Sequence, residues 1–334
     1  MSNRVLSVFN TCGISGRENV QHYVESIKGI VDQKFEGHQV ALSSCRNSPQ
    51  AIQYLREKLG DSITYNLIDD VVPVNVSFNH TVRKNVEHFG EFESYLYIDS
   101  GMTFFYDSIL DQNVVSKLYS LHKEKNCAMT SGRVDRDSGI ERWLGVDHPD
   151  EMTKENRDRY KKLDSHIKIP IGKTVNLHIQ LFDNSIYKFY DRKLMPDVFA
   201  SFCSESIHSY ICASLGKNFY LSKDVFLPHE TSMDMACSGN RPEWAKQKKG
   251  IENWQHTFAL PYPETMNNIL KNPEMWDSGC GYEILENVAP HNPDCYDENE
   301  KCKDPERLGD FILDNFYLKK WDFNYDDVNS VFIK

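Results

Sequence analysis

A mixed α/β fold, with a mainly parallel sheet and helices on both faces, is predicted by three features of residues 4–100. Short apolar runs alternate with segments in which apolar residues recur every three or four positions. Glycine and proline stand at the boundaries between these segments. The fourth apolar run ends at an acid, Asp99, which Ser100 and Gly101 follow. Alternating strands and helices of this kind favour parallel strand pairing.

Each expected element has a local signature. The apolar run at 4–10 leads into a loop that contains Gly13, as a buried strand would. In the next helical segment, Val20, Tyr23 and Ile27 share one face. Pro49 opens a later helix at its first turn. In chain order the expected elements are strand 4–10, helix 18–33, strand 38–45, helix 48–60, strand 62–68, helix 79–90 and strand 94–100.

The rest of the chain is less regular. Residues 133–165 are polar and charged, which fits an insertion or an exposed helix. Ile207, Tyr210 and Ile211 form a helical stripe, and Gly216 is a natural end for that helix. The other expected elements are a strand with its continuation at 174–190, a strand at 219–228 and a short amphipathic helix within 305–323.

Two regions follow from this pattern. Residues 1–235 are expected to form one domain of α/β type. Residues 236–334 are expected to form a C-terminal extension, with a lid-like loop and helices packing on that domain, because the chain becomes rich in Trp, Pro, Lys and Asn from about Ser232.

Composition limits the possible partners. The chain has 334 residues and a net charge of −11, whereas a general nucleic-acid binder is usually basic. No apolar run approaches the roughly 20 residues that a bilayer span needs. The N-terminus lacks the apolar core of a signal peptide. We therefore expect a cytoplasmic protein with no nucleic-acid partner and no integral membrane segment.

Three polar residues stand at expected ends of secondary structure, where functional groups collect. Asp99 ends the fourth strand, Glu205 opens a helix and His229 ends the strand at 219–228. Each also has a plain structural explanation. Asp99 could cap a turn, Glu205 could complement the helix dipole, and His229 could be a loop histidine. Glu230 is an adjacent rival to Glu205.

The segments "VLSVFNTCGISGRENVQHYVESI" and "NHTVRKNVEHFGEFESYLYIDSG", with Glu205 and His229, resemble a GT-A-type nucleotide-sugar glycosyltransferase of the inverting, polysaccharide-synthesising kind. The resemblance covers roughly residues 4–235, and it implies that the domain of residues 1–235 binds a nucleotide sugar and is catalytic. It implies sugar transfer from a nucleotide-diphosphate sugar to a hydroxyl of a glycan or lipid-linked glycan. It also implies that Asp99 and His229 hold Mn²⁺ or Mg²⁺ with the donor diphosphate, and that Glu205 is the catalytic base.

The chain departs from that family in two places. The family's Asp-x-Asp motif would place a second acid where this chain has Gly101. The family's pair of acids at the helix start is reduced to one acid, because Ser206 follows Glu205. The separation of Glu205 from His229, 24 residues, agrees with the family.

The same chemistry can be argued without the family. A nucleoside diphosphate leaves with concentrated negative charge, which a divalent cation stabilises. An acceptor hydroxyl must lose a proton as it attacks, and a carboxylate can take it. The anionic form of Glu205 is favoured at a helix N-terminus.

Further residues are expected to contact the donor. Arg83 is a candidate phosphate contact on its helix, although a surface arginine is the simpler interpretation. A basic segment after His229 could close over the diphosphate or be a solvated loop. The expected donor-binding set is Thr11, Ser44, Arg46, Asn47, Arg83, Asp99, Ser100, Gly101, Arg241 and Trp244.

Two other functions stay open. A sugar-phosphate nucleotidyltransferase shares a similar sheet, and "NTCGISGRENV" is a weak form of its phosphate loop. A non-catalytic nucleotide- or glycan-binding protein on a decayed transferase fold would explain Gly101. An extra zinc cluster of His291, Cys295 and Cys302 matches no established spacing.

Overall fold

The structure is a computed structural model of the chain. It describes residues 3–14, 20–45, 47–69, 74–106, 108–134, 163–171, 173, 175, 177–196, 207–229, 302–317 and 328–334. In these ranges no helix is both long and apolar enough to cross a membrane.

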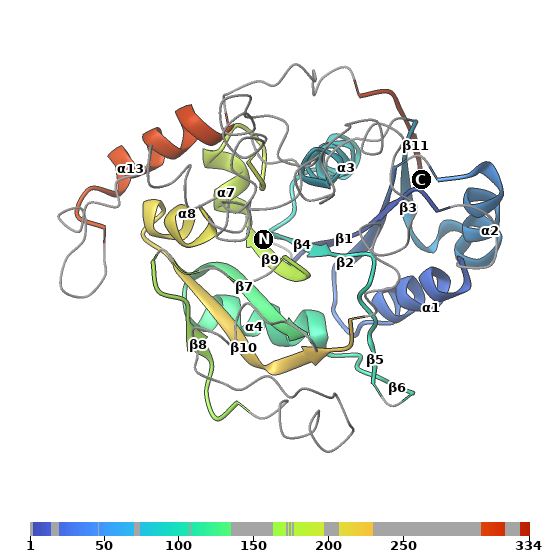
Figure 1. The fold of residues 1–334 in the computed structure, drawn as a ribbon, viewed down its shortest axis with the longest axis horizontal. Coiled ribbons are helices and arrows are strands. Elements are labelled where there is room, and N and C mark those ends of the chain that lie inside the picture. The colour runs from blue at the N-terminus through green and yellow to red at the C-terminus, as the bar shows by residue number, and fades with distance from the viewer. Residues whose placement is uncertain are drawn as a thin grey trace, which may run out of the picture.

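The main sheet has nine strands within the described residues, in the order β11-β3-β2-β1-β4-β9-β7-β10-β8 (Figure 1). Strands β1 to β4 are mutually parallel, and β10 is parallel to β7. Strand β9 is antiparallel to both of its neighbours, and the edge strands β8 and β11 are also antiparallel. The strands are β1 (Val5–Cys12), β2 (His38–Cys45), β3 (Thr64–Ile68), β4 (Ser94–Ile98), β7 (Cys127–Val134), β8 (Ile167–Lys168), β9 (Ile179–Asp183), β10 (Asn218–Leu227) and β11 (Ser330–Ile333).

Helices cover both faces of the sheet, as the sequence predicts. The helices are α1 (Val20–Val31), α2 (Pro49–Leu59), α3 (Val74–Phe89), α4 (Val114–Glu124), α7 (Asn184–Phe189), α8 (His208–Ser214) and α13 (Pro305–Ile312). Shorter elements are a 3₁₀ turn (Gly60–Ser62), a π-helical turn (Leu313–Tyr317) and a separate hairpin of β5 (Phe105–Tyr106) and β6 (Ile109–Leu110).

Strand β4 shows how the two faces are buried. Its tyrosines, Tyr95 and Tyr97, belong to a core that includes side chains of α3, α7, α8 and α13. The alternate residues, Leu96 and Ile98, belong to a second core with α1, α2 and α4. Successive side chains of a strand point to opposite faces, so residues 95–98 form an unbroken apolar run. Asp99 is therefore the first acid beyond a segment buried on both sides.

All seven elements expected within residues 4–100 occur. One boundary is wrong: the helix expected at 79–90 begins at Val74. Two asparagines hold its early turns against a distant segment of the chain. Asn75 Nδ2 donates to the carbonyl of Pro196 at 3.1 Å, and Asn79 Nδ2 donates to that of Met195 at 2.8 Å. These partners lie more than a hundred positions away, so local periodicity does not reveal them.

The C-terminal residues contribute to both the sheet and the helical layer. Strand β11 pairs antiparallel with β3, where Val331 lies opposite Leu67. Helix α13 packs near α7 and α8, so closely that a Cβ on Gly309 would lie 2.8 Å from Phe189. The expected helix in 305–323 is thus present in its first part. The domain boundary at residue 235 stays a prediction.

Candidate functional site

Three side chains meet at the edge of the sheet where the parallel strands end. Asp99 follows β4, His178 precedes β9 and His229 follows β10. Because β9 runs antiparallel to β4, with Ile98 opposite Ile179, the residue before β9 lies beside the residue after β4. The Asp99 N–H donates to the His178 carbonyl at 2.9 Å and so continues that pairing.

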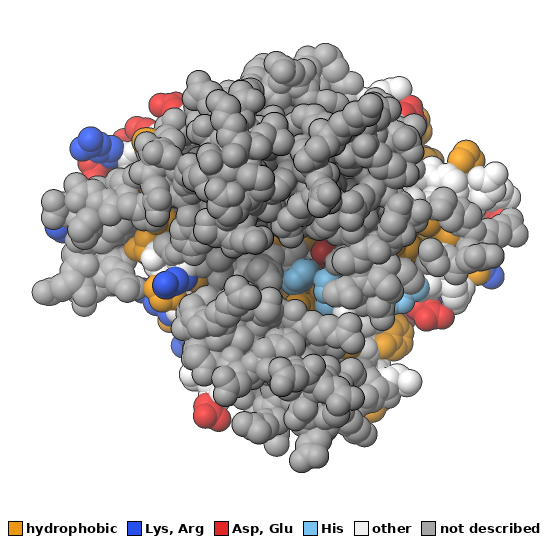
Figure 2. Space-filling view, viewed as in Figure 1, with side chains coloured by type: hydrophobic (Ala, Val, Ile, Leu, Met, Phe, Trp, Pro, Cys, Tyr) orange, Lys and Arg blue, Asp and Glu red, His pale blue; other side chains and the backbone are white. Residues whose placement is uncertain are grey.

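His229 reaches the same place from β10. It forms an antiparallel bridge with Met102, and the Thr103 N–H donates to the Pro228 carbonyl at 3.3 Å. The turn after β4 and the end of β10 are thereby joined through their backbones. Figure 2 shows histidine side chains beside an acidic one near the middle of this face of the molecule.

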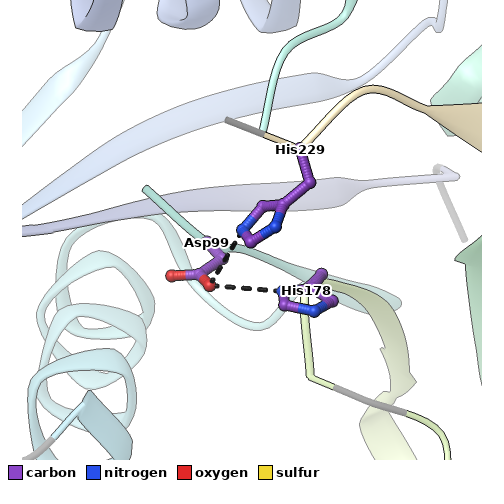
Figure 3. A group of neighbouring side chains, drawn as sticks. All are labelled: Asp99, His178 and His229. Carbon is purple, nitrogen blue, oxygen red and sulfur yellow. Dashed lines mark hydrogen bonds and ion pairs between the residues drawn. The ribbon is translucent and has the colours of Figure 1, made fainter. Parts of the chain in front are cut away.

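The three side chains point toward one another (Figure 3). Asp99 Oδ2 lies 3.4 Å from His178 Nδ1 and 3.9 Å from His229 Nε2. The two imidazole rings are 4.2 Å apart between centroids. One ligand atom from each residue lies within 4.8 Å of the other two. One oxygen and two nitrogen donors at this spacing fit a divalent metal ion.

The Asp99 carboxylate bonds to the turn that follows it through one oxygen and faces two histidines through the other. Its Oδ1 accepts a hydrogen bond from the Ser100 N–H at 2.8 Å, and the Met102 N–H donates to the Asp99 carbonyl at 3.1 Å, which closes a turn. Its Oδ2 faces the two histidines. Burial raises the carboxyl pKa, but the hydrogen bond and charge of His178, the charge of His229 and the Ser100 bond together hold the pKa below its usual value.

Asn10 supports the site from β1. Its Nδ2 donates to the Ile98 carbonyl at 3.1 Å, directly before Asp99. The side chain is buried, so β1 and β4 are tied together where both approach the edge. This bond positions the backbone that carries Asp99.

Thr11, Ser44 and Asn47, three of the expected donor-binding residues, form one buried cluster. Asn47 Nδ2 donates to Thr11 Oγ1 at 2.8 Å and to Ser44 Oγ at 2.7 Å. Asn47 Oδ1 accepts from the Ile14 N–H at 2.8 Å. The amide of Asn47 is thus fully engaged within the protein, and its evident effect is to fix the loops after β1 and β2. Direct contact with a nucleotide stays a prediction.

Arg83 lies elsewhere. Burial raises the pKa of Tyr187 in α7 and the nearby charge of Arg83 lowers it, and the Tyr187 ring packs against Tyr95 near the start of β4. Asp99 follows the other end of β4, so the structure does not bring Arg83 together with Asp99. Its assignment as a phosphate contact gains no support from this position.

Several expected site residues lie outside the described residues. They are Arg46, Glu205, Glu230, Arg241 and Trp244, together with His291 and Cys295 of the possible zinc cluster. Their assignments stay predictions.

His178 was missed by the sequence reasoning. It lies in the segment 174–190, which alternates as a strand should. The missing information is the direction of that strand. An antiparallel strand beside β4 brings its first residues to the edge that holds Asp99, so a histidine just before such a strand is a detectable signal.

Comparisons with known proteins yield structural neighbours only. No protein-family model matches the chain. No curated protein matches it. The mannosyltransferase PcManGT from Pyrobaculum calidifontis, in complex with GDP-Man and Mn²⁺, is 11% identical, with 93% of this chain and 85% of that chain covered and a TM-score of 0.45. S. aureus TarS 1–349 is also 11% identical, with 88% and 92% covered and a TM-score of 0.43.

Of these two solved structures, PcManGT is described as a mannosyltransferase.

Proposed function

We propose that this protein transfers a sugar from a nucleotide-diphosphate sugar to a hydroxyl of a glycan or lipid-linked glycan, with inversion. The observation that carries the proposal is the grouping of Asp99, His178 and His229 at the carboxyl edge of the parallel strands. These are ligands for a divalent ion, and such an ion suits a leaving group that carries diphosphate charge.

The location of the group supports the proposal. From β1 the chain moves outward through β2 and β3, and then crosses back to place β4 on the other side of β1. In open α/β sheets, ligands bind in the crevice outside the strand ends where the order reverses in this way. Asp99 follows β4 and Thr11 lies near the end of β1, so both border that crevice.

The residues have distinct roles in this mechanism. A divalent metal bound here would supply charge stabilisation to the departing diphosphate. Asp99 would offer Oδ2 to it, while Oδ1 stays bonded to the Ser100 N–H and fixes the plane of the carboxylate. The imidazoles of His178 and His229 would complete the protein's share of the ligands. For the donor, we propose contacts from the loops after β1 and β2, including Arg46, and from Arg241 and Trp244.

We assign Glu205 as the base that takes the proton of the attacking hydroxyl. The family resemblance supports the role, and in the sequence Glu205 stands three positions before the first residue of α8 (His208–Ser214). We expect Glu205→Ala to lower the transfer rate by about 10²–10⁴-fold, the usual contribution of a positioned base. Donor binding should be retained. The matched variant is Glu230→Ala; if that variant loses the rate and Glu205→Ala keeps it, the base assignment is wrong.

A product assay tests the function itself. The protein is incubated with Mn²⁺ and each of the sugar nucleotides of uridine, guanosine, cytidine and thymidine, with and without a mixture of glycan acceptors. A transferase releases nucleoside diphosphate and yields a longer glycan. A nucleotidyltransferase acts on a sugar phosphate and a nucleoside triphosphate and releases pyrophosphate instead. Binding heat with no turnover for any sugar nucleotide would defeat the proposal. If a sugar phosphate with a nucleoside triphosphate also gives no turnover, the result identifies a binding protein.

A further inference from the structure

Among the described residues, the donor atoms at the candidate site are mostly nitrogen. Two imidazoles and one carboxylate converge there, and neither Ser100 nor Gly101 extends a second acid to the group. Mg²⁺ and Ca²⁺ favour sites made of oxygen ligands, whereas imidazole is a ligand for first-row transition metals. We propose that Asp99, His178 and His229 form a three-ligand site that selects a transition-metal dication over Mg²⁺, with His178 as an essential ligand. The role of this ion in sugar transfer rests on the proposed function.

The spacing agrees with such a site. Two ligand atoms at about 2.1 Å from one metal ion are roughly 3.0 Å apart in octahedral geometry and roughly 3.4 Å apart in tetrahedral geometry. The distance from Asp99 Oδ2 to His178 Nδ1, 3.4 Å, already lies in that range. His229 Nε2, at 3.9 Å from the same oxygen, needs a shift of about half an ångström. A rotation of the side chain supplies a movement of this size.

The ligands are held by strands rather than by a free loop. The backbone bond from Asp99 to His178 fixes one pair, and the bridge between Met102 and His229 fixes the third member relative to the same turn. His229 is buried, and the side chains of Asp99 and His178 are largely buried. A preorganised set of this kind binds metal without first ordering the chain.

The electrostatic balance also favours a dication. A single carboxylate leaves a bound dication with one unit of positive charge, which a diphosphate can neutralise further. Three protein ligands leave up to three octahedral positions for water or phosphate oxygens. The same set of two histidines and one carboxylate is the one that non-haem iron uses. Mg²⁺ prefers oxygen ligands, including water, to imidazole nitrogen. It should therefore bind weakly to a site in which two of the three protein ligands are imidazoles.

Metal binding in the absence of nucleotide tests the proposal. The full chain is stripped with a chelator, and Mn²⁺, Co²⁺, Zn²⁺ and Mg²⁺ are titrated separately by calorimetry. Bound Mn²⁺ is also counted by electron paramagnetic resonance. We expect affinity to rise from Mn²⁺ through Co²⁺, with Zn²⁺ also above Mn²⁺, and we expect Mg²⁺ to bind at least tenfold more weakly than Mn²⁺. Equal affinity for Mg²⁺ and Mn²⁺ would overturn the proposal.

Two variants of His178 make the test specific. His178→Ala should lower the affinity for Mn²⁺ at least tenfold. His178→Asp replaces a nitrogen ligand with an oxygen ligand, so it should reduce the ratio of the Mn²⁺ affinity to the Mg²⁺ affinity. The matched control is His88→Gln, which removes an exposed histidine of α3. Unchanged Mn²⁺ binding in both His178 variants would reject His178 as a ligand. Because the readout is binding alone, a protein that binds metal selectively but transfers no sugar disproves the proposed function and leaves this inference standing.

Discussion

Asp99→Asn should reduce metal-dependent sugar transfer by about 10³–10⁵-fold. A metal ion contributes several kcal/mol to the stabilisation of a charged leaving group, and each 1.36 kcal/mol corresponds to tenfold in rate. The amide removes the charge of Oδ2, the atom that faces both histidines. It can still accept the Ser100 N–H bond at the other oxygen, so the turn after β4 is retained. The loss should therefore fall on activity and metal affinity while the protein stays folded.

The matched control for this variant is Asp69→Asn. Asp69 also follows a parallel strand, β3, but its carboxylate accepts a bond from Asn329 Nδ2 at 2.9 Å and has no histidine partner among the described residues. Rates at saturating donor, Mn²⁺ titrations and circular dichroism are measured for both variants. Full transfer by Asp99→Asn at low Mn²⁺ would remove Asp99 from the mechanism, whatever the control does.

The elements of the first 100 residues were predictable because their signals are local. Each strand from β1 to β4 contains a short run of apolar residues, and each helix between them has its own periodicity. Strand β7 had no such signal and was not predicted. All eight of its residues are buried, including Thr130 and Ser131. Thr130 Oγ1 bonds the Leu118 carbonyl and Ser131 Oγ bonds the Ile179 carbonyl, so polar residues are tolerated in a central strand.

Two of the three side chains at the candidate site could be placed from the sequence, because they stand at the ends of expected strands. Asp99 and His229 each end a recognisable strand, and the parallel pattern places such ends at one edge. His178 enters the site only because β9 is antiparallel, which depends on pairing with β4 and β7 rather than on its own sequence. The buried cluster around Asn47 shows the opposite case. Its members were expected at neighbouring strand ends, but their bonds to one another are visible only in the structure.

Asp183, at the other end of β9, should be the most sensitive position for stability. Its Oδ2 lies 3.0 Å from His122 Nε2, and its Oδ1 lies 2.5 Å from Lys217 Nζ. Oδ1 also accepts the Ser185 N–H at 3.0 Å and so caps α7. Removing one partner of a buried ion pair costs about 3–5 kcal/mol. We expect Asp183→Ala to lower the free energy of unfolding by about that amount, as measured by urea denaturation at pH 7.

Two comparisons separate the causes of this loss. Asp183→Asn keeps a good capping residue but removes the charge, so it should recover only the roughly 1 kcal/mol that a cap contributes. Glu87→Ala breaks an exposed pair with Lys84 and should change stability by less than about 1 kcal/mol. A loss in Asp183→Ala no larger than that of Glu87→Ala would mean that the Asp183 network does not stabilise the fold.

The pH dependence gives an independent check on Asp183. Burial raises the pKa of its carboxyl, but the bonds from His122, Lys217 and Ser185 outweigh burial and hold the pKa well below its usual value. A carboxyl with a lowered folded-state pKa contributes stability above its unfolded pKa of about 3.9, and this contribution is lost as the pH falls toward the folded value. The difference in unfolding free energy between the native protein and Asp183→Asn should thus be constant near pH 7 and shrink below pH ~4. A difference that stays constant through this acid range would show that the charge of Asp183 is not what stabilises the start of α7.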